Sequence, residues 1–476
     1  MDLSLSQDQQ AIEDLFATFF ENECPTERVR KAEPLGFDPD LWERLAETGA
    51  SAMGLPESLG GSGTSPLDAA LVAESLGRSL APLPFIEHFV ASRLLVRCMG
   101  EDPALGVLAG PKAIATLAHQ PVKRTRAHLV PAGAVASHVV ALAESEVLLC
   151  TEDPPGRAAA NFAASPLADR KLSPENCRVI LAGSEAGTPI SDIHADAVDE
   201  WRALTANALV GVAQGAFDLG LAYALERTQF DVPIGSFQAL QHRFADLAVA
   251  LDGARLLARK AAWAFEEAPT DARRLAGMAL VFCGDVANEA AAFALHVHGG
   301  YGVSEEYDIQ LYFRRAKGWR LVLEDPAVEI ERLGNLLLGP VENARGELVR
   351  RFGPSSRRTG PGRERPASSR AAPNTTGPFT ARRPNAAGCA RRCPCHRMDR
   401  AVAPRNSLRS SSSTNPRLYR ACSRESPSPA WATPSPSADR TSPRSRPAQN
   451  DRVRIGSSTA RRCGPRSLKF PAGSCF

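Results

Sequence analysis

The chain has 476 residues, of which 43% are hydrophobic and 23% charged, so it is long enough for two or three domains with a proper core. No uncharged apolar run reaches the roughly 18 residues of a membrane-spanning helix, and the first residues, MDLSLSQDQQ, lack the basic and apolar regions of a secretory signal. We therefore expect a cytoplasmic protein without a membrane partner. The net charge of +3 hides two unlike parts, because residues 1–340 carry −18 and residues 341–476 carry +21.

Residues 1–104 are expected to form an N-terminal helical domain. Residues 13–20 place apolar side chains at helical spacing, and Asp38 precedes a second amphipathic stretch as a start signal. The segment GLPESLGGSG at 54–63 interrupts the helices through its Pro and Gly content. Residues 67–80 then return to helical spacing.

Residues 105–198 change to short apolar runs and predict a small middle β domain. The runs are AIATLA, HLVPAG, SHVVALA, EVLLCTE and CRVILAG, separated by Gly, Pro, Asp and charged turns. This spacing is typical of the strands of a small sandwich or barrel.

Residues 199–340 predict a C-terminal bundle of three or four long helices joined by short loops. The whole body is therefore an α+β chain, mainly α. The expected core stripes are Leu209, Val212, Ala216, Leu219 and Tyr223; Phe244, Leu247, Leu251, Ala254, Ala258 and Ala261; and Leu275, Met278, Phe282, Val286, Phe293 and Val297.

The basic tail, residues 341–476, contains 27 Arg, 17 Pro and 20 Ser, and we expect it to be disordered because it has little apolar surface to bury. It could be an arginine-rich arm for nucleic acid, a solvated extension, or a translated wrong reading frame after an intact domain. Its sparse aromatic residues argue against a nucleic-acid partner. The abrupt loss of acidic residues and the excess of arginine favour the wrong reading frame.

The cysteines indicate thiols rather than metal ligands or disulfides. The five in the body show no CxxC pairing, as is usual for the buried thiols of a cytosolic protein. The CARRCPCH run at 389–396 has no second ligand pair at zinc-site spacing, so we predict no metal site. The body cysteines are Cys24, Cys98, Cys150, Cys177 and Cys283.

The first irregular stretch in the bundle is ERTQFDVPIGSFQALQH at 226–242. Arg227 is a planar donor fork suited to a pyrophosphate. Phe230 offers an apolar flank, and Gln238 can hydrogen-bond a sugar or base edge. The alternative is an ordinary helix–helix loop with a surface arginine.

The second irregular stretch is HVHGGYG at 296–302. Three glycines in four residues at a helix end let the backbone approach a ligand, and successive amides can hold an anion. The alternative is a glycine-type helix stop. His296 and His298 are two residues apart and do not share a helix face, so a metal pair is not expected.

In this order, separated by two helices, the two stretches resemble the acyl-CoA dehydrogenase family of flavoproteins. The resemblance covers about residues 1–338, including LWERLAETGASAMGLPESLGGSG and HVHGGYGVSEEYDIQLYFRRAKG. It implies an N-terminal helical domain, a middle β domain and a C-terminal four-helix bundle. It also implies FAD between the bundle and the β domain, a homotetramer or a heterotetramer with a related subunit, and an electron-transfer flavoprotein as partner.

The resemblance also carries over site residues. Arg227 matches the arginine that holds the FAD pyrophosphate, and Phe230 and Gln238 match positions that line the cofactor. Asp231 stands where a glycine is usual, and its carboxylate would repel phosphate unless it turned away. The stretch that reaches the FAD of a second subunit is matched by His296, Val297, His298, Gly299 and Gly300.

The implied reaction removes the α proton of an acyl-CoA thioester with a carboxylate and transfers the β hydride to the flavin. The family's base follows an Arg-Asp-Ala run, here Arg-Arg-Ala, and counting from it puts Leu323 at the base position and Glu324 one place beyond. Other members carry the base where Trp201 stands, with Glu200 one residue away. We expect Glu324 to be the base. Glu200, or no functional base, are the alternatives, because a shift of one residue rotates a helical side chain by about 100°.

The middle domain lacks the family's usual Thr-Glu flavin loop and its Trp-Ile-Thr strand. Two functions are therefore weighed. The first is an FAD-dependent acyl-CoA dehydrogenase, an oxidoreductase of lipid metabolism with acyl-CoA as substrate. The second is a non-catalytic subunit that completes the FAD site of a partner in a heteromeric acyl-CoA dehydrogenase.

Overall fold

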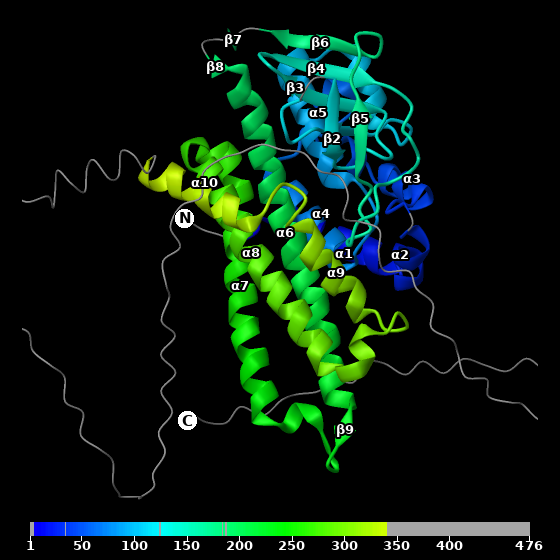
Figure 1. The fold of residues 1–476 in the computed structure, drawn as a ribbon, viewed down its shortest axis with the longest axis vertical. Coiled ribbons are helices and arrows are strands. Elements are labelled where there is room, and N and C mark those ends of the chain that lie inside the picture. Colours follow the sequence, from blue (N-terminus) through cyan, green and yellow to red (C-terminus); the bar gives the residue numbers. More distant parts are fainter. Residues whose placement is uncertain (1–3, 34, 123–124, 183, 186–187, 340–476) are drawn as a thin grey trace, which may run out of the picture. The chain divides into compact units, whose positions relative to one another are not determined.

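The computed structural model describes residues 4–33, 35–122, 125–182, 184–185 and 188–339. Along the chain they form a helical block, a β block and a second helical block, which confirms the predicted mainly helical α+β fold (Figure 1). The predictions for the basic tail, including the CARRCPCH run, lie outside the described residues.

The N-terminal block begins its helices where the sequence supplies caps. The Asp38 carboxylate accepts the N–H of Leu41 at 3.0 Å, and Ser65 and Asp68 form a capping box with each other's backbone. The elements of this block are α1 (Gln7–Glu23), α2 (Thr26–Ala32), α3 (Pro39–Glu47), η1 (Ala50–Ala52), η2 (Glu57–Leu59), α4 (Pro66–Arg78), α5 (Phe85–Met99) and η3 (Pro103–Ala109).

The β block is built on one four-stranded sheet in the order β1-β3-β4-β6. β1 runs parallel to β3, and the other neighbours are antiparallel. Two further strand pairs stand apart from this sheet, so the described strands form no closed barrel. The strands are β1 (Ala115–Leu117), β2 (Arg126–Val130), β3 (His138–Ala143), β4 (Glu146–Thr151), β5 (Ala168–Lys171), β6 (Cys177–Ala182), β7 (Ser184–Glu185) and β8 (Thr188–Pro189).

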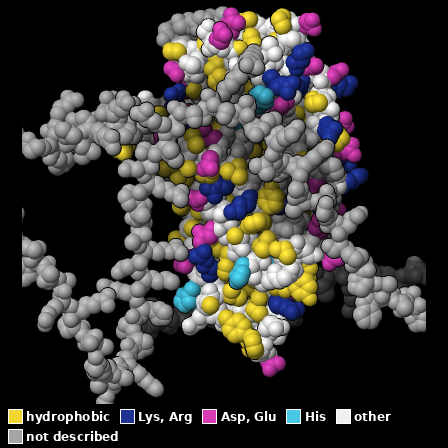
Figure 2. All heavy atoms as spheres, in the orientation of Figure 1, with side chains coloured by type: hydrophobic (Ala, Val, Ile, Leu, Met, Phe, Trp, Pro, Cys, Tyr) yellow, Lys and Arg dark blue, Asp and Glu magenta, His cyan; other side chains and the backbone are white. Residues whose placement is uncertain are grey.

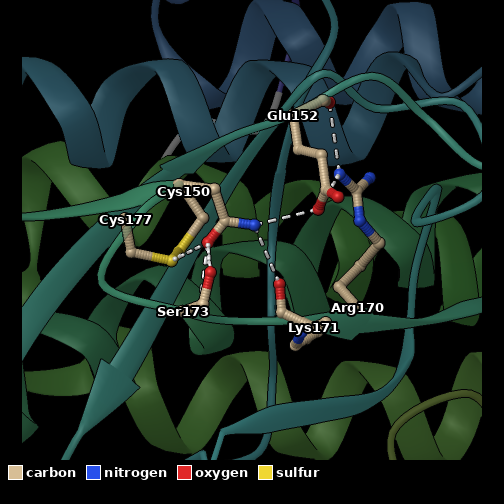
Figure 3. The surroundings of a disulfide bond; sticks show 7 residues. Cys150, Glu152, Arg170, Lys171, Ser173 and Cys177 are labelled. Carbon is tan, nitrogen blue, oxygen red and sulfur yellow. Dashed lines mark hydrogen bonds and ion pairs between the residues drawn. A yellow bond between two sulfur atoms is a disulfide. The ribbon is translucent and has the colours of Figure 1, made fainter.

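A disulfide joins Cys150 on β4 to Cys177 on β6 (Figure 3). The expectation of thiols is therefore wrong for these two residues. They are 27 residues apart in sequence but are direct cross-strand partners in the sheet, which spacing along the chain does not reveal. Cys24 and Cys283 are buried thiols, as predicted.

The C-terminal block is a helical bundle in which α6 packs against α8 and α7 (Figure 1). α6 begins nine residues before the predicted start of the bundle, because Ile193 and Ala197 continue its buried face towards the β block. The elements are α6 (Ile190–Glu226), β9 (Thr228–Gln229), β10 (Val232–Pro233), η4 (Ile234–Ser236), α7 (Gln238–Glu267), α8 (Pro269–Val297), η5 (Gly299–Val303), α9 (Ile309–Trp319) and α10 (Pro326–Leu338).

The predicted core stripe is confirmed on α7 and is partly wrong on α8. All six residues expected on α7 are buried. On α8, Met278 and Phe282 are 39% and 41% exposed. Leu275, Val286 and Val297 of the predicted stripe are buried, and most of the remaining buried residues of α8 are small, such as Ala279 and Cys283, which let the helices approach closely.

Two described helices, α6 and α8, are long and apolar enough to cross a membrane by length and composition. Of their most apolar windows, 56% and 50% of the residues are buried inside the fold. This burial is that of core helices in a bundle.

The N-terminal block meets the bundle where α4 crosses α6. A Cβ atom on Gly77 would overlap the carbonyl oxygen of Ala208, and a Cβ on Gly211 would overlap that of Glu74. The two backbones are therefore in direct contact at this crossing, which only glycine permits.

Candidate functional site

The two irregular stretches lie together at one end of the bundle, where β9 is labelled in Figure 1. The Tyr223 ring near the end of α6 stacks on the His298 ring at the end of α8, with centroids 4.2 Å apart. The carbonyl of Tyr223 also accepts the N–H of Arg227 at 2.9 Å. Within one chain, Tyr223 therefore links the start of the 226–242 stretch to the turn at 296–302, whereas the resemblance has that turn reach the FAD of a second subunit.

The hairpin that follows Arg227 projects its side chains into solvent. Phe230 is 87% exposed, and its ring packs edge-on against the Phe237 ring, with centroids 6.3 Å apart. Phe230 and Asp231 have φ angles of 53° and 65°, a tight turn that usually takes glycine or asparagine. Arg227 and Gln238 are exposed as well. Figure 2 shows apolar side chains gathered at this end of the molecule.

The glycine turn is open on its outer side. A Cβ atom on Gly299 or Gly300 would meet nothing within 4 Å, whereas one on Gly302 would overlap the carbonyl of Leu295. Gly302 is thus required by packing inside the chain, and Gly300 is not. Bare backbone without an internal packing role is what a ligand or a second subunit could approach.

The predicted cofactor residues fall into two groups. Val297 and His298 are buried, and the His298 Nδ1 lies 2.7 Å from the carbonyl oxygen of Ala294, so both serve the packing of the turn. The exposed residues, which face outward, are Arg227, Phe230, Gln238, His296, Gly299 and Gly300.

Glu324, the predicted base, lies in the loop between α9 and α10. Its Oε1 is 3.9 Å from Nη2 of the buried Arg202. Partial burial raises the pKa of Glu324, and the nearby Glu329 carboxylate adds to this shift. Glu324 lines a cavity of about 10 Å³ against Leu280 of α8. Its role as the base stays a prediction.

Arg202 holds a buried ionic cluster together. Its Nη1 donates to Asp199 at 2.8 Å, and its Nε donates to Glu329 at 3.2 Å. Arg332 also contacts both carboxylates. Burial raises the pKa of Asp199 against the opposing effect of the arginines, so the cluster depends on complete pairing.

A cavity of about 800 Å³ lies between α5, the first turns of α6 and the start of α8. It is lined by Glu200, whose Oε1 is 2.8 Å from Nε of Arg93 and whose pKa is raised by burial. Asp196 is paired with Arg97 and Arg273 on the same wall. The predicted cofactor residues are not among those that line this cavity.

A second cavity, which we call the junction cavity, lies where the N-terminal block, the β block and the bundle meet, and has a volume of about 70 Å³. This is the region in which the resemblance places FAD. It is lined among others by Pro131 and Leu167 of the β block, Trp201 and Thr205 of α6, Arg315 of α9, and Val322. Glu324, two residues after Val322, is not among its lining residues.

Large side chains and a loop fill most of this region. The Trp201 indole donates to Glu87 Oε1 at 3.3 Å, and the His119 ring packs on Trp201 with centroids 4.2 Å apart. The loop between β4 and β5 presses Ala163 against Gly318 of α9, where a Cβ would overlap it. The remaining 70 Å³ is well below the roughly 300 Å³ of even small ligand pockets.

Sequence reasoning missed this filling. The sequence shows a tryptophan at position 201, where some family members carry the base, and it lacks the family's flavin loop. Neither observation shows that His119 and Trp201 are in contact. Arg315 was seen only as the second residue of the Arg-Arg-Ala run. The sequence did contain a signal for an altered site, because the family's run has an aspartate at the position of Arg315.

Comparison with known proteins identifies the family. Residues 6–101 match the acyl-CoA dehydrogenase N-terminal domain, and residues 193–322 match the acyl-CoA dehydrogenase C-terminal domain. The acyl-CoA dehydrogenase IpdE2 of Mycolicibacterium smegmatis is 32% identical over 332 residues, covering 69% of this chain and 98% of the relative.

Solved structures agree with this result. The ChsE4–ChsE5 complex from Mycobacterium tuberculosis matches with 27% identity and a TM-score of 0.63, over 71% of this chain and 100% of that chain. The FAD complex of PigA shares the fold with 19% identity and a TM-score of 0.62, over 73% of this chain and 100% of that chain. The chain belongs to the acyl-CoA dehydrogenase family, the FAD-dependent oxidoreductases that act on acyl-CoA.

Proposed function

We propose that this chain is one subunit of a heteromeric acyl-CoA dehydrogenase, and that its bundle end completes an FAD site shared with a related partner chain. The observation that carries the proposal is the contrast between an open bundle end and a filled junction cavity of about 70 Å³. The likeness to ChsE4–ChsE5, a complex of two chains, supports the same arrangement.

The residues at the bundle end fit a dinucleotide. Arg227 offers an exposed guanidinium, which can bind pyrophosphate oxygens in a bidentate manner. Gly299 and Gly300 leave backbone open to approach, and Phe230 provides exposed apolar surface beside them. When bound, FAD supplies the acceptor for the β hydride of the acyl-CoA. The part of this chain is to bind and orient that cofactor.

The junction cavity does not fit a flavin ring, so we derive no step there. A base must come within hydrogen-bond reach of the α proton of the thioester. Because Glu324 does not line the junction cavity, the proposal assigns the base to the partner chain. We also propose that the complex is a tetramer, that it is located in the cytoplasm and that it passes electrons to an electron-transfer flavoprotein.

The alternative is that this chain is a complete acyl-CoA dehydrogenase with Glu324 as its own base. The raised pKa of Glu324 and its position beside Arg202 favour this alternative, because a partly buried carboxyl can act as a base near neutral pH. It requires the loop between β4 and β5 to move away from α9.

The absorbance of the protein decides between the two. The full chain is purified alone and together with a related acyl-CoA dehydrogenase chain from the same genome. We expect the chain alone to be colourless, and the complex to be yellow and to bleach when an acyl-CoA is added. A chain that is yellow alone, with one FAD per chain that bleaches with acyl-CoA, contradicts the proposal.

The base is tested in the complex with Glu324→Gln and, for the second candidate of this chain, with Glu200→Gln. If the partner supplies the base, both variants keep kcat within about threefold of the parent complex, far less than the 10²–10⁴-fold effect of losing a general base. A loss of 10² or more in Glu324→Gln alone would assign the base to this chain.

A further inference from the structure

Three buried polar groups around the junction cavity have no hydrogen-bond partner in the described structure. They are Nη1 of Arg315, Oγ1 of Thr205 and Oγ of Ser165. Buried polar groups are nearly always paired, so these three groups leave hydrogen-bonding capacity for a polar ligand in one small cavity. They come from α9, α6 and the loop between β4 and β5, so the fold brings them together from distant parts of the chain.

Arg315 carries a charge that the protein only partly neutralises. Arg315 is 2% exposed. The Oε1 atom of its ion-pair partner Glu33 lies 4.0 Å from Nη1, beyond hydrogen-bond distance. Glu33 also binds the guanidinium of Arg314, so one carboxylate serves two arginines. Burial lowers the pKa of Arg315 to about 10, which leaves the guanidinium protonated at neutral pH.

The other ionisable group that lines the cavity is Glu87. Burial raises the pKa of its carboxyl. Its Oε1 accepts a hydrogen bond from the Trp201 indole. The cavity therefore presents an unpaired guanidinium nitrogen and two unpaired hydroxyls, donors that can bind the oxygens of an anion.

We propose that the junction cavity is a binding site for a small carboxylate of two or three carbons, held by Arg315, Thr205 and Ser165. A guanidinium fork matches the planar oxygens of a carboxylate. The volume of about 70 Å³ is well below that of ligand pockets, roughly 300 Å³ or more, which favours a small anion. Leu83, Ile86 and Val322 supply an apolar wall for the alkyl group. This inference does not depend on which subunit carries the base.

Calorimetric titration of the full chain at constant ionic strength tests the chemistry of the ligand. Sodium acetate and sodium propionate are expected to bind one per chain, acetamide at least tenfold more weakly, and benzoate not at all. Glutarate, a longer dicarboxylate, tests whether the site takes a free short carboxylate or the carboxylate end of a longer ligand. We expect glutarate not to bind. Equal responses to acetate and acetamide, or none to either, would mean that the cavity holds water only and would overturn the proposal.

Variants assign the binding to the cavity. Arg315→Gln is expected to abolish acetate binding, and Thr205→Val to raise the dissociation constant at least tenfold. Ser92→Ala is the control, because Ser92 is also a buried hydroxyl without a partner but does not line this cavity. If Arg315→Gln does not fold, Thr205→Val decides, and unchanged affinity in that variant refutes the site. The flavin content of the complex tests the proposed function separately, since neither variant touches the bundle end.

Discussion

His88 on α5 connects three elements, so its replacement tests the fold at the border of the N-terminal and β blocks. Its Nε2–H donates to the carbonyl of Leu108 in η3 at 3.0 Å, and its Nδ1 accepts the N–H of Ala115 in β1 at 3.0 Å. The residue is 1% exposed. Burial lowers its pKa from 6.5 to about 4, because the charged form loses its hydration.

The sign of the pH effect follows from this lowered pKa. Between pH 6.5 and about 4 the unfolded chain binds a proton at His88 that the folded chain does not, so stability falls as the pH falls through that range. At pH 5 the loss from this one residue is about 2 kcal/mol, from about 1.4 kcal/mol per pKa unit.

The variant His88→Gln removes this titration and leaves at least one buried backbone group unpaired. We expect a loss of about 1–3 kcal/mol at pH 7.5, and a drop from pH 7.5 to pH 5 that is smaller than in the parent chain by about 2 kcal/mol. Urea unfolding of both proteins at both pH values measures this difference. The pKa values of His119, His138 and His194 are lowered as well, but their effects cancel because both proteins contain them.

The control is His242→Gln, since His242 is exposed at the start of α7. It is expected to leave the pH dependence unchanged. Equal losses of stability from pH 7.5 to pH 5 in the parent chain and in His88→Gln would refute the reasoning.

Three further predictions concern the bundle end, the docking of the β block and the disulfide. Arg227→Lys should lower the ratio of flavin to protein absorbance in the purified complex, because lysine lacks the bidentate fork; an unchanged ratio would remove Arg227 from the cofactor site. Gly318→Ala should lower the free energy of unfolding by about 1–3 kcal/mol because its Cβ would overlap Ala163, whereas Gly334→Ala, with nothing within 4 Å, should not destabilise. Cys177→Ser should lower the free energy of unfolding by about 2–4 kcal/mol, and peptide mapping without reductant should recover the link to Cys150; two free thiols would contradict it.

Much of the fold could be predicted because local patterns decide it. The stripe from Phe244 to Ala261 repeats at helical spacing, and each of its residues is buried on α7. Asp38 caps α3 as its residue type suggests.

The remaining features depend on contacts between distant segments. The pairing of Cys150 with Cys177 follows from strand register, which their spacing does not encode. The outward direction of Met278 was missed because large residues were taken as core, whereas close packing on α8 uses small ones. The filling of the junction cavity arises from His119 and Trp201, which are 82 positions apart in the chain and meet only after folding.

The contact of α4 with α6 at Gly77 and Gly211 has a consequence for the whole body of the protein. Two helices whose main chains touch have no side-chain layer on which to slide, so no interdomain hinge can operate at this crossing. Heat should therefore melt the first helices and the bundle in a single calorimetric peak. A chimera in which the first 109 residues are replaced by those of a relative would need a glycine at both crossing points for the two helices to pack in the same way.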